Sequence, residues 1–239
     1  MSKTLIIAEI GINHDGSRQL LRRMIRGAKA AGADIFKTQV YDPGVLFPGG
    51  SITAGGVDWF RRVMQTKLTA DDIKWLATEC DTAGIEFMAS CFDFERLQWL
   101  EAVSVKRHKV AYRMNQNRKL IDAMTATGKP KLLSAGMNSV VVGMVRRDSL
   151  LYCVPKYPTA YNELDFASIF ALRTFDGFSD HTVGIGAAIA AVSRGATIIE
   201  KHVKPDNRWC GPDADCSVDL RDFGKMVECI RQVEEINLC

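Results

Sequence analysis

The sequence predicts a (β/α)8 TIM barrel, an α/β fold in which residues 1–239 form one domain. Short β-branched or apolar runs alternate with amphipathic helical stretches along the whole chain, which indicates parallel strands joined by helices. The length of 239 residues is close to the roughly 250 residues of a typical barrel. Neither a G-x-G-x-x-G motif nor a P-loop is present, and this disfavours the rival architecture, an open doubly wound sheet.

Eight strand-like runs follow one another along the chain. Ser17 is a typical N-cap for the first helix, and Thr69 begins the helix that runs to Gly84. The glycine-rich residues 42–67 are expected to be the longest irregular segment and to lie on the catalytic rim, whereas residues 137–148 leave room for only a stunted fifth helix. The expected strands span residues 4–10, 34–41, 86–92, 108–113, 131–135, 150–154, 177–181 and 197–203. The other expected helices span residues 95–103, 119–127, 166–175, 186–194 and 220–235.

The composition is ordinary for a soluble enzyme, with 47% hydrophobic and 25% charged residues. The net charge of +3 is spread without a block of like charges, so nothing favours a nucleic-acid partner. No apolar run could span a membrane and no signal-peptide pattern is present, so a cytoplasmic protein without a membrane partner is expected. The seven cysteines form no CxxC pair and are expected to be free thiols, with a metal or disulfide role for Cys210 and Cys216 as the alternative.

Polar residues stand at the ends of several predicted strands, where a barrel gathers its active site. His181 and His202 end neighbouring strands, and neutral imidazole is a common ligand of first-row divalent ions. Two histidines would leave coordination positions open, as a catalytic metal requires. Glu9 and Asp213 are the carboxylates that could complete the shell or handle protons. The alternative is that each histidine is a hydrogen-bonded core residue.

Lys37 and Lys109 interrupt strands that are otherwise apolar. Burying either lysine would be costly unless it met an anion. A phosphate or carboxylate ligand would meet that need, with Ser134 and Ser179 as hydroxyl donors. The alternative is that the lysines extend toward solvent or pair with acidic neighbours.

A set of short strings, in matching order and spacing from about residue 4 to 236, resembles the sialic acid (N-acetylneuraminate) synthase family and its legionaminate and pseudaminate relatives. No one string is decisive, but the ordered set is specific. The strings are AEIGINHDG at residues 8–16, AGAD at 31–34, KTQ at 37–39, TGKP at 127–130, LSAGM at 133–137, YPT at 157–159, FSDHT at 178–182, IEKH at 199–202 and GPD at 211–213.

The resemblance implies a metal-assisted condensation of phosphoenolpyruvate with an N-acetyl amino-sugar aldehyde, giving a nonulosonic acid. It implies that His181 and His202 hold a divalent ion, Mn²⁺ with Mg²⁺ as the alternative, and that this ion polarises the aldehyde. Glu9 and Asp213 would position the metal-bound water and the acceptor sugar, while Tyr157 would line the pocket. The residues implied to bind phosphoenolpyruvate are Lys37, Lys109, Ser134 and Ser179.

The chain departs from the family pattern after the lysine of the fourth strand. The family has Ser-Gly-Glu there, whereas this chain has Tyr112, Arg113 and Met114. Arg113 could replace the serine as an anion ligand because a guanidinium binds phosphate through two hydrogen bonds, but Met114 cannot move a proton. Pro155 also stands where the family places a polar pocket side chain.

The family continues into a small C-terminal antifreeze-like domain, whereas this sequence stops at Cys239. The expected partners are therefore a second copy in a homodimer or a separately encoded lid domain. Two alternatives to the synthase remain open on the same barrel. One is another metal-dependent aldolase or lyase, and the other is a binding or scaffold protein that has lost catalysis.

Overall fold

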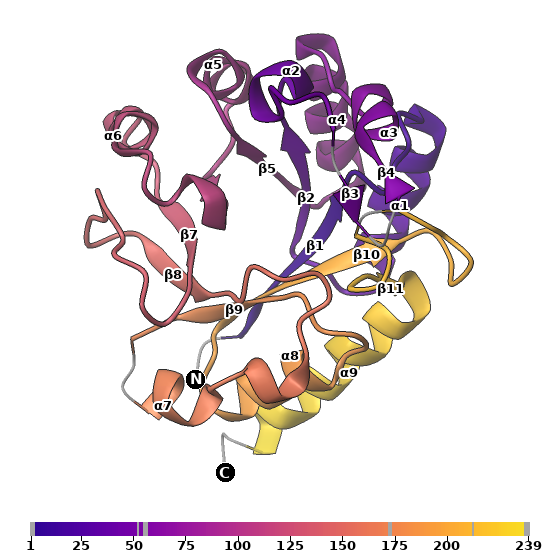
Figure 1. The fold of residues 1–239 in the computed structure, drawn as a ribbon. Coiled ribbons are helices and arrows are strands. Elements are labelled where there is room, and N and C mark those ends of the chain that lie inside the picture. The colour runs from indigo at the N-terminus through magenta and orange to yellow at the C-terminus, as the bar shows by residue number, and fades with distance from the viewer. Residues whose placement is uncertain (1–2, 52, 55–56, 172–173, 212, 237–239) are drawn as a thin grey trace.

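The computed structural model describes residues 3–51, 53–54, 57–171, 174–211 and 213–236, and it confirms the predicted barrel. Eight parallel strands form a ring with helices outside it, and the first strand pairs with the last to close the ring (Figure 1). The strands are β1 (Leu5–Gly11), β2 (Ile35–Val40), β5 (Glu86–Cys91), β6 (His108–Val110), β7 (Lys131–Ala135), β8 (Ser149–Tyr152), β9 (Gly177–Asp180) and β10 (Ile198–Lys204). A two-residue strand, β11 (Val218–Asp219), extends from β10.

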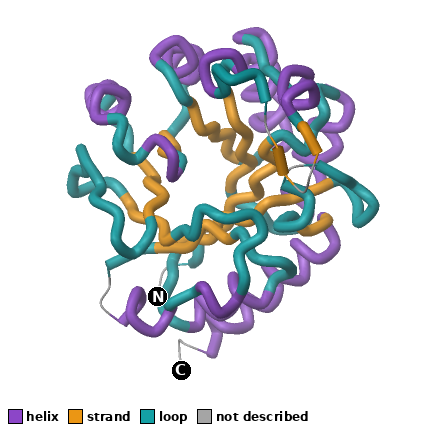
Figure 2. The backbone as a smooth tube through the Cα atoms, in the orientation of Figure 1, coloured by secondary structure: helices purple, strands orange, loops and turns teal. Residues whose placement is uncertain are grey.

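Helices cover the outer face of most of the ring (Figure 2). Local capping explains where two of them begin: the Ser17 side chain accepts a hydrogen bond from the Leu20 backbone, and Thr69 forms a capping box with Asp72. Gly84 ends the second of these helices in the left-handed region, with φ of 67°. The covering helices are α1 (Arg18–Ala30), α4 (Ala70–Ala83), α5 (Phe94–Ala102), α6 (Arg118–Ala126), α7 (Phe166–Ala171), α8 (Gly186–Ser193) and α9 (Leu220–Ile236). None of the described helices is long and apolar enough to cross a membrane.

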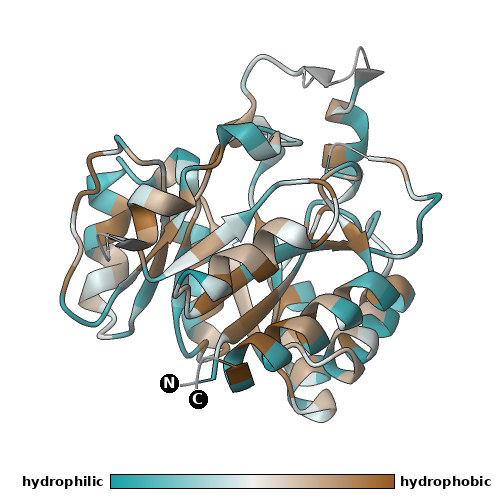
Figure 3. Ribbon diagram, turned by 90° about the horizontal axis from the view of Figure 1, so that it is seen from below, coloured by the Kyte–Doolittle hydropathy of each residue, from teal (hydrophilic) through white to brown (hydrophobic). Residues whose placement is uncertain are grey.

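Apolar residues of the strands pack on both sides of the barrel wall, and brown stretches of strand are visible in Figure 3. Outward residues such as Ile6 and Phe36 join the large core beneath the helices, while a separate buried cluster fills the barrel interior. Gly177 leaves room for this inner cluster, since a Cβ there would lie 2.3 Å from the Ile198 carbonyl oxygen. The inner cluster consists of Ile7, Ile35, Met88, Leu132, Leu151 and Ile198.

Two expectations for the loops were wrong. Residues 42–67 are not one irregular segment, because Asp42 caps α2 (Pro43–Leu46) and α3 (Phe60–Gln65) follows a small hairpin of β3 (Thr53–Ala54) and β4 (Val57–Asp58). No helix of any length lies between β7 and β8, where the structure describes every residue from 136 to 148. Instead Val141 and Val142 pack against the core from an irregular segment.

Smaller differences concern element ends. The fourth barrel strand stops at Val110 rather than at residue 113, and Tyr112–Met114 form the 3-10 helix η1. The α7 helix ends at Ala171 rather than at residue 175, and residues 172–173 of the expected helix lie outside the described residues. The six described cysteines are free, as expected, and Cys239 lies outside the described part.

Candidate active site

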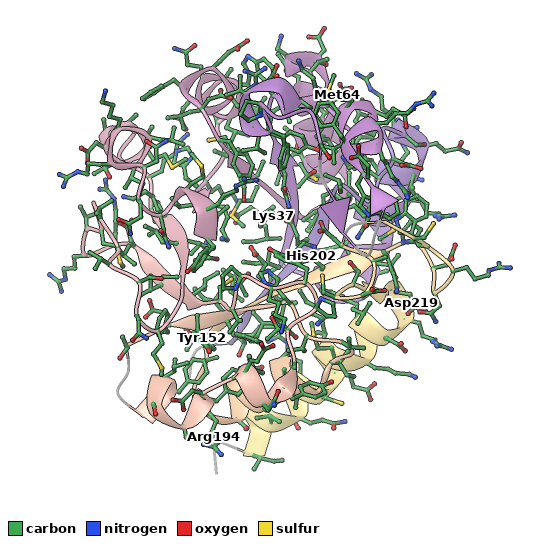
Figure 4. All side chains as sticks on the ribbon, viewed as in Figure 1. Lys37, Met64, Tyr152, Arg194, His202 and Asp219 are labelled. Carbon is green, nitrogen blue, oxygen red and sulfur yellow. The ribbon has the colours of Figure 1, made fainter. Side chains whose placement is uncertain are left out.

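A polar layer lies directly above the apolar plug of the barrel. Side chains two residues apart on a strand point the same way, so each inward apolar residue is followed by an inward polar one, as Ile7 is by Glu9 and Ile35 by Lys37. The Lys37 ammonium lies 2.5 Å from Glu9 and 3.5 Å from Glu200. Figure 4 shows Lys37 and His202 near the middle of the ring of strands.

Serine hydroxyl groups form hydrogen bonds with the charged side chains of this layer. Lys109 donates a hydrogen bond of 2.6 Å to Ser134 and lies 3.9 Å from Glu200. Ser179 donates to Glu200 at 2.8 Å, and Lys37 donates to Ser90 at 3.3 Å. We call Glu9, Lys37, Lys109 and Glu200 the ionic floor, because two ammonium groups and two carboxyl groups form the base of the cavity.

The pKa values of the ionic floor follow from burial and mutual charge. Burial alone would raise the pKa of Glu200, but Lys109 and Lys37 outweigh it and lower that pKa to about 2. Burial lowers the pKa of Lys109 and raises that of Glu9. Burial opposes the charge of Lys37, yet Glu200 and Glu9 raise its pKa. Glu200 is therefore the anion around which both lysines are held.

The two histidines lie next to each other above the ionic floor, with ring centres 5.5 Å apart. Burial lowers the pKa of His181 to about 4 and that of His202 well below its usual value, so both rings are neutral at pH 7. The His181 Nδ1 atom lies 2.9 Å from the Val154 carbonyl oxygen, which can only accept, so Nδ1 carries the proton and Nε2 keeps a free lone pair. The Tyr157 ring stacks on His181 at 4.0 Å.

The donor set suits a catalytic metal. The His202 Nδ1 atom is buried without a hydrogen-bond partner and lies 3.8 Å from the Asp213 carboxylate. Burial, with a contribution from Glu9, raises the pKa of Asp213 to about 7, and a bound cation would lower it again. No group of three His, Cys, Asp or Glu side chains with metal-binding geometry occurs in the described part of the chain. The groups of this cavity that could ligate an ion are the two imidazoles and the nearby Asp213 carboxylate, whose present arrangement is not a three-ligand cluster.

The cavity has a volume of about 390 Å³, and one wall of its mouth is apolar. The loop after β1 contributes Ile12, and α2, α3 and the end of β5 contribute the other apolar residues. Arg113 closes this side, with its guanidinium 5.0 Å from the centre of the Phe47 ring. The apolar wall consists of Ile12, Leu46, Phe47, Val63 and Phe92.

Every residue that the sequence predicts for the site lines this one cavity. They are Glu9, Lys37, Lys109, Arg113, Ser134, Tyr157, Ser179, His181, His202 and Asp213. Pro155 lines it too, but Met114 packs against the core instead. Sequence reasoning assigned no role to Glu200, although its position two residues before His202 on the same strand was the signal that could have found it. Gln39 and Ser90 were missed as well.

Known proteins resemble this chain over most of its length. The profile of the NeuB family matches residues 24–237. An uncharacterized protein of Methanocaldococcus jannaschii is 30% identical over 98% of this chain and 72% of its own length. The N,N'-diacetyllegionaminic acid synthase of Campylobacter jejuni is 29% identical over 98% of this chain and 78% of its own length. Among solved structures, the N-acetylneuraminic acid synthetase of Leptospira borgpetersenii in complex with citrate has a TM-score of 0.89 at 29% identity, covering 98% of this chain and 85% of that one.

Proposed function

Because the chain belongs to the NeuB family and is similar to a legionaminic acid synthase, we propose that it condenses phosphoenolpyruvate with an N-acetyl amino-sugar aldehyde to form a nonulosonic acid. The observation that carries the proposal is the presence of two neutral, adjacent imidazoles directly above two buried lysines in one cavity. The imidazoles suit a divalent ion and the lysines suit an anionic substrate.

We further propose that His181 and His202 hold Mn²⁺, with Mg²⁺ as the alternative. The proton on the His181 Nδ1 atom leaves Nε2 as a donor, and the unpartnered Nδ1 of His202 is a second buried nitrogen without another task. When bound, such an ion supplies Lewis-acid polarisation of the aldehyde carbonyl.

The protein's own residues bind and orient the reactants. Lys37 and Lys109 are the cations for the phosphate and carboxylate of phosphoenolpyruvate, and both are prearranged by Glu200. Ser134 and Ser179 already have their hydroxyl groups in the same layer. A bound anion would take over hydrogen bonds that these groups make with one another in the empty cavity.

The remaining groups act on the acceptor side. Glu9 and Asp213 position water and the sugar, and the Tyr157 ring covers His181. In the reaction, C3 of phosphoenolpyruvate forms a bond to the aldehyde carbon, and the aldehyde oxygen takes up a proton. Water then adds to C2, a proton leaves, and the C2–O bond breaks to release inorganic phosphate. No oxidant or reductant is needed.

Met114 makes this proposal specific to the present chain. Because Met114 packs against the core, the carboxyl groups that line the cavity are Glu9, Glu200 and Asp213 among the described residues. Proton transfer by a carboxyl group would therefore use one of these three residues. If these groups cannot support the synthase reaction, two alternatives remain. The chain then catalyses another metal-dependent aldolase or lyase reaction, or it binds ligands without catalysis.

The test is release of inorganic phosphate by metal-free protein supplied with Mn²⁺, phosphoenolpyruvate and a panel of N-acetylhexosamines, alongside a measurement of bound metal. We expect release that requires both the sugar and the metal. His181→Ala should abolish it, whereas His108→Gln, which alters a buried histidine that contacts Thr127 and Glu101 and does not line the cavity, should retain it. A folded, metal-loaded protein that releases no phosphate with any sugar would contradict the synthase proposal.

A further inference from the structure

Asp213 is a site residue that no barrel strand positions. It lies in the loop between β10 and β11, whereas Glu9 and His202 lie on strands and His181 directly follows one. The loop must nevertheless hold the Asp213 carboxylate 3.8 Å from the His202 Nδ1 atom. A Cβ on Gly11 would lie 3.1 Å from this carboxylate, so the glycine at the end of β1 leaves the space that it occupies. The place of Asp213 therefore depends on contacts with segments that are remote in sequence.

The side chain of Asn13, just after β1, is linked to the loop of Asp213 and to the strand of His202. Its amide nitrogen donates to the Val203 carbonyl oxygen and to the Ser217 hydroxyl group, each at 2.9 Å. The Ser217 hydroxyl donates in turn to the Asp213 carbonyl oxygen at 2.6 Å. Val203 follows His202 in β10, the strand that pairs with β1 (Figure 1). One amide group is thus bonded to the backbone beside both residues.

The donor and acceptor roles in this series of hydrogen bonds are determined. A carbonyl oxygen can only accept, so the contact with Val203 requires the NH₂ group of Asn13 to face β10. A hydroxyl group has one proton, and Ser217 donates it to Asp213 while accepting from Asn13. Asn13 and Ser217 are only 1% and 5% exposed, so water competes little for these bonds. We call the series from Asn13 through Ser217 to the Asp213 carbonyl group the Asn13 relay.

Other contacts of the same loop provide a comparison. The Cys216 Sγ atom lies 3.2 Å from the Asp213 carbonyl oxygen, but a thiol is a weak donor and this one does not continue to Asn13. Lys204 supports the loop one residue further on, where it donates to the Ala214 carbonyl oxygen at 2.9 Å. The relay differs from both contacts because it joins Asp213 itself to the end of β1.

We infer that Asn13 and Ser217 are positioning residues for the reaction, and that their hydrogen bonds set the distance between the Asp213 carboxylate and the His202 ring. The inference rests on the proposed function, in which His202 holds the metal ion and Asp213 positions water and the sugar. Removal of a group that orients a metal site from outside commonly costs about 10–100-fold in metal affinity or activity. Loss of the relay should therefore displace Asp213 while leaving the lysines of the ionic floor in place.

The first test is the steady-state kinetics of phosphate release by Ser217→Ala, with Mn²⁺ and the best acceptor from the sugar panel. We expect kcat to fall about tenfold and the KM for phosphoenolpyruvate to stay within about twofold of wild type, because the lysines that bind it are unchanged. Ser217→Thr keeps the hydroxyl group and should recover most of kcat. Cys216→Ala is the matched control, since it removes only the weak donor and should leave kcat within about twofold.

Asn13→Leu tests the other end of the relay with a side chain of similar size. It should lower kcat at least as much as Ser217→Ala does. The double variant should lose little more than Asn13→Leu alone, because both substitutions act through the same Asp213 carbonyl group. Additive losses would overturn the relay. If Asn13→Leu does not fold, the Ser217 and Cys216 variants decide the question.

Binding of Mn²⁺ alone, measured by calorimetry on the full chain, is a second readout that needs no turnover. We expect Ser217→Ala and Asn13→Leu to weaken it about tenfold, and Cys216→Ala to leave it within about twofold of wild type. The inference is overturned if Ser217→Ala binds Mn²⁺ and turns over like wild type, or if Cys216→Ala is affected equally. A wild-type protein that releases no phosphate, while the Mn²⁺ affinities separate as expected, would contradict the proposed function and leave the positioning role standing.

Discussion

The two sides of the barrel mouth are built differently. Above β1, β2 and β10, which we call the tied side, Arg62 of α3 joins its own segment to the loops after β1 and β10. It donates to Asp15 at 2.6 Å and to the Cys210 carbonyl oxygen, and it lies 5.0 Å from the Trp209 ring. Above β7 and β8, which we call the loose side, residues 136–148 contain no helix and expose Val140 to 73%.

This difference matches the distribution of the site residues. The tied side carries Glu9, His202 and Asp213, which must hold their relative positions, and the loop with Asp213 is the one that Arg62 binds. On the loose side β7 contributes Ser134, near the floor, where strand pairing already positions it. A barrel can therefore lose a covering helix without losing its site if the missing helix is not the one that supports a catalytic loop.

The loose side should depend on a single buried ion pair. Lys131 and Asp148 lie 2.9 Å apart with fully buried side chains, and they join the start of β7 to the last residue of the helix-free segment. Asp148→Ala should lower the free energy of unfolding by about 3–5 kcal/mol, because it leaves a buried ammonium without its partner. Urea denaturation measures this loss. Asp122→Ala removes an exposed pair with Arg118 and should cost below about 1 kcal/mol; equal losses in the two variants would contradict the prediction.

The tied side should be sensitive to acid. Burial lowers the pKa of His14, after β1, to about 4, and its Nδ1 atom accepts a hydrogen bond from the Gly16 backbone. Because the folded pKa lies below the unfolded value, the unfolded chain binds the proton first. The stability that neutral His14 provides is complete above about pH 6.5 and is lost as the pH falls toward 4.

The measurement is urea denaturation at pH 7.5 and pH 5. His14→Gln should reduce the loss of unfolding free energy between these pH values by about 2 kcal/mol relative to wild type. His108 also has a pKa of about 4 through burial, so a residual loss should persist in the variant. An unchanged difference between the two pH values would show that His14 does not titrate in this way.

Replacing Arg62, which joins the loops of the tied side, should have a moderate effect on stability. Arg62→Met should lower the free energy of unfolding by about 1–2 kcal/mol, because it removes charge-assisted hydrogen bonds that are only partly buried. It should also change the near-ultraviolet circular dichroism of Trp59 and Trp209, which flank the guanidinium at 5.7 Å and 5.0 Å. Arg62→Lys keeps the charge and should recover part of the stability. A spectrum identical to wild type would mean that the loops hold their positions without Arg62.

Removal of a helix N-cap should have the smallest effect on stability, and this effect should be the same on the tied side and the loose side. Thr69 caps α4 beside the tied side, and Asn117 caps α6 beside the loose side. Replacing either with alanine should cost about 1 kcal/mol, since each substitution removes one side-chain cap. Thermal or urea unfolding of the pair measures this. A much larger loss for Asn117→Ala would mean that the loose side differs in its helices as well as in its loops.

Sequence patterns predicted the features that depend on local periodicity. Ser17 and Thr69 marked helix starts correctly, and the position of His181 and His202 at strand ends was enough to bring them together, because parallel strands end on one rim. The strand order followed from the same alternation.

Contacts between distant loops could not be predicted in this way. Arg62 and Cys210 are 148 residues apart, and no sequence pattern in either segment indicates contact with the other. The helix-free segment was expected to hold a short helix because barrels alternate, yet its residues pack Val141 and Val142 without one. Glu200 was overlooked because its importance lies in contacts from two other strands.

The apolar plug of Ile7, Ile35 and their neighbours fills the barrel beneath the ionic floor, so the cavity is a well that is closed at its base. In a well of this kind, the depth at which a reactant binds determines the order in which the reactants enter. A reactant that rests on the ionic floor must arrive before one that fills the mouth, and whatever is released at the bottom must wait for the upper occupant to leave or move aside. Steady-state kinetics should therefore show ordered addition, with phosphoenolpyruvate first and the sugar second.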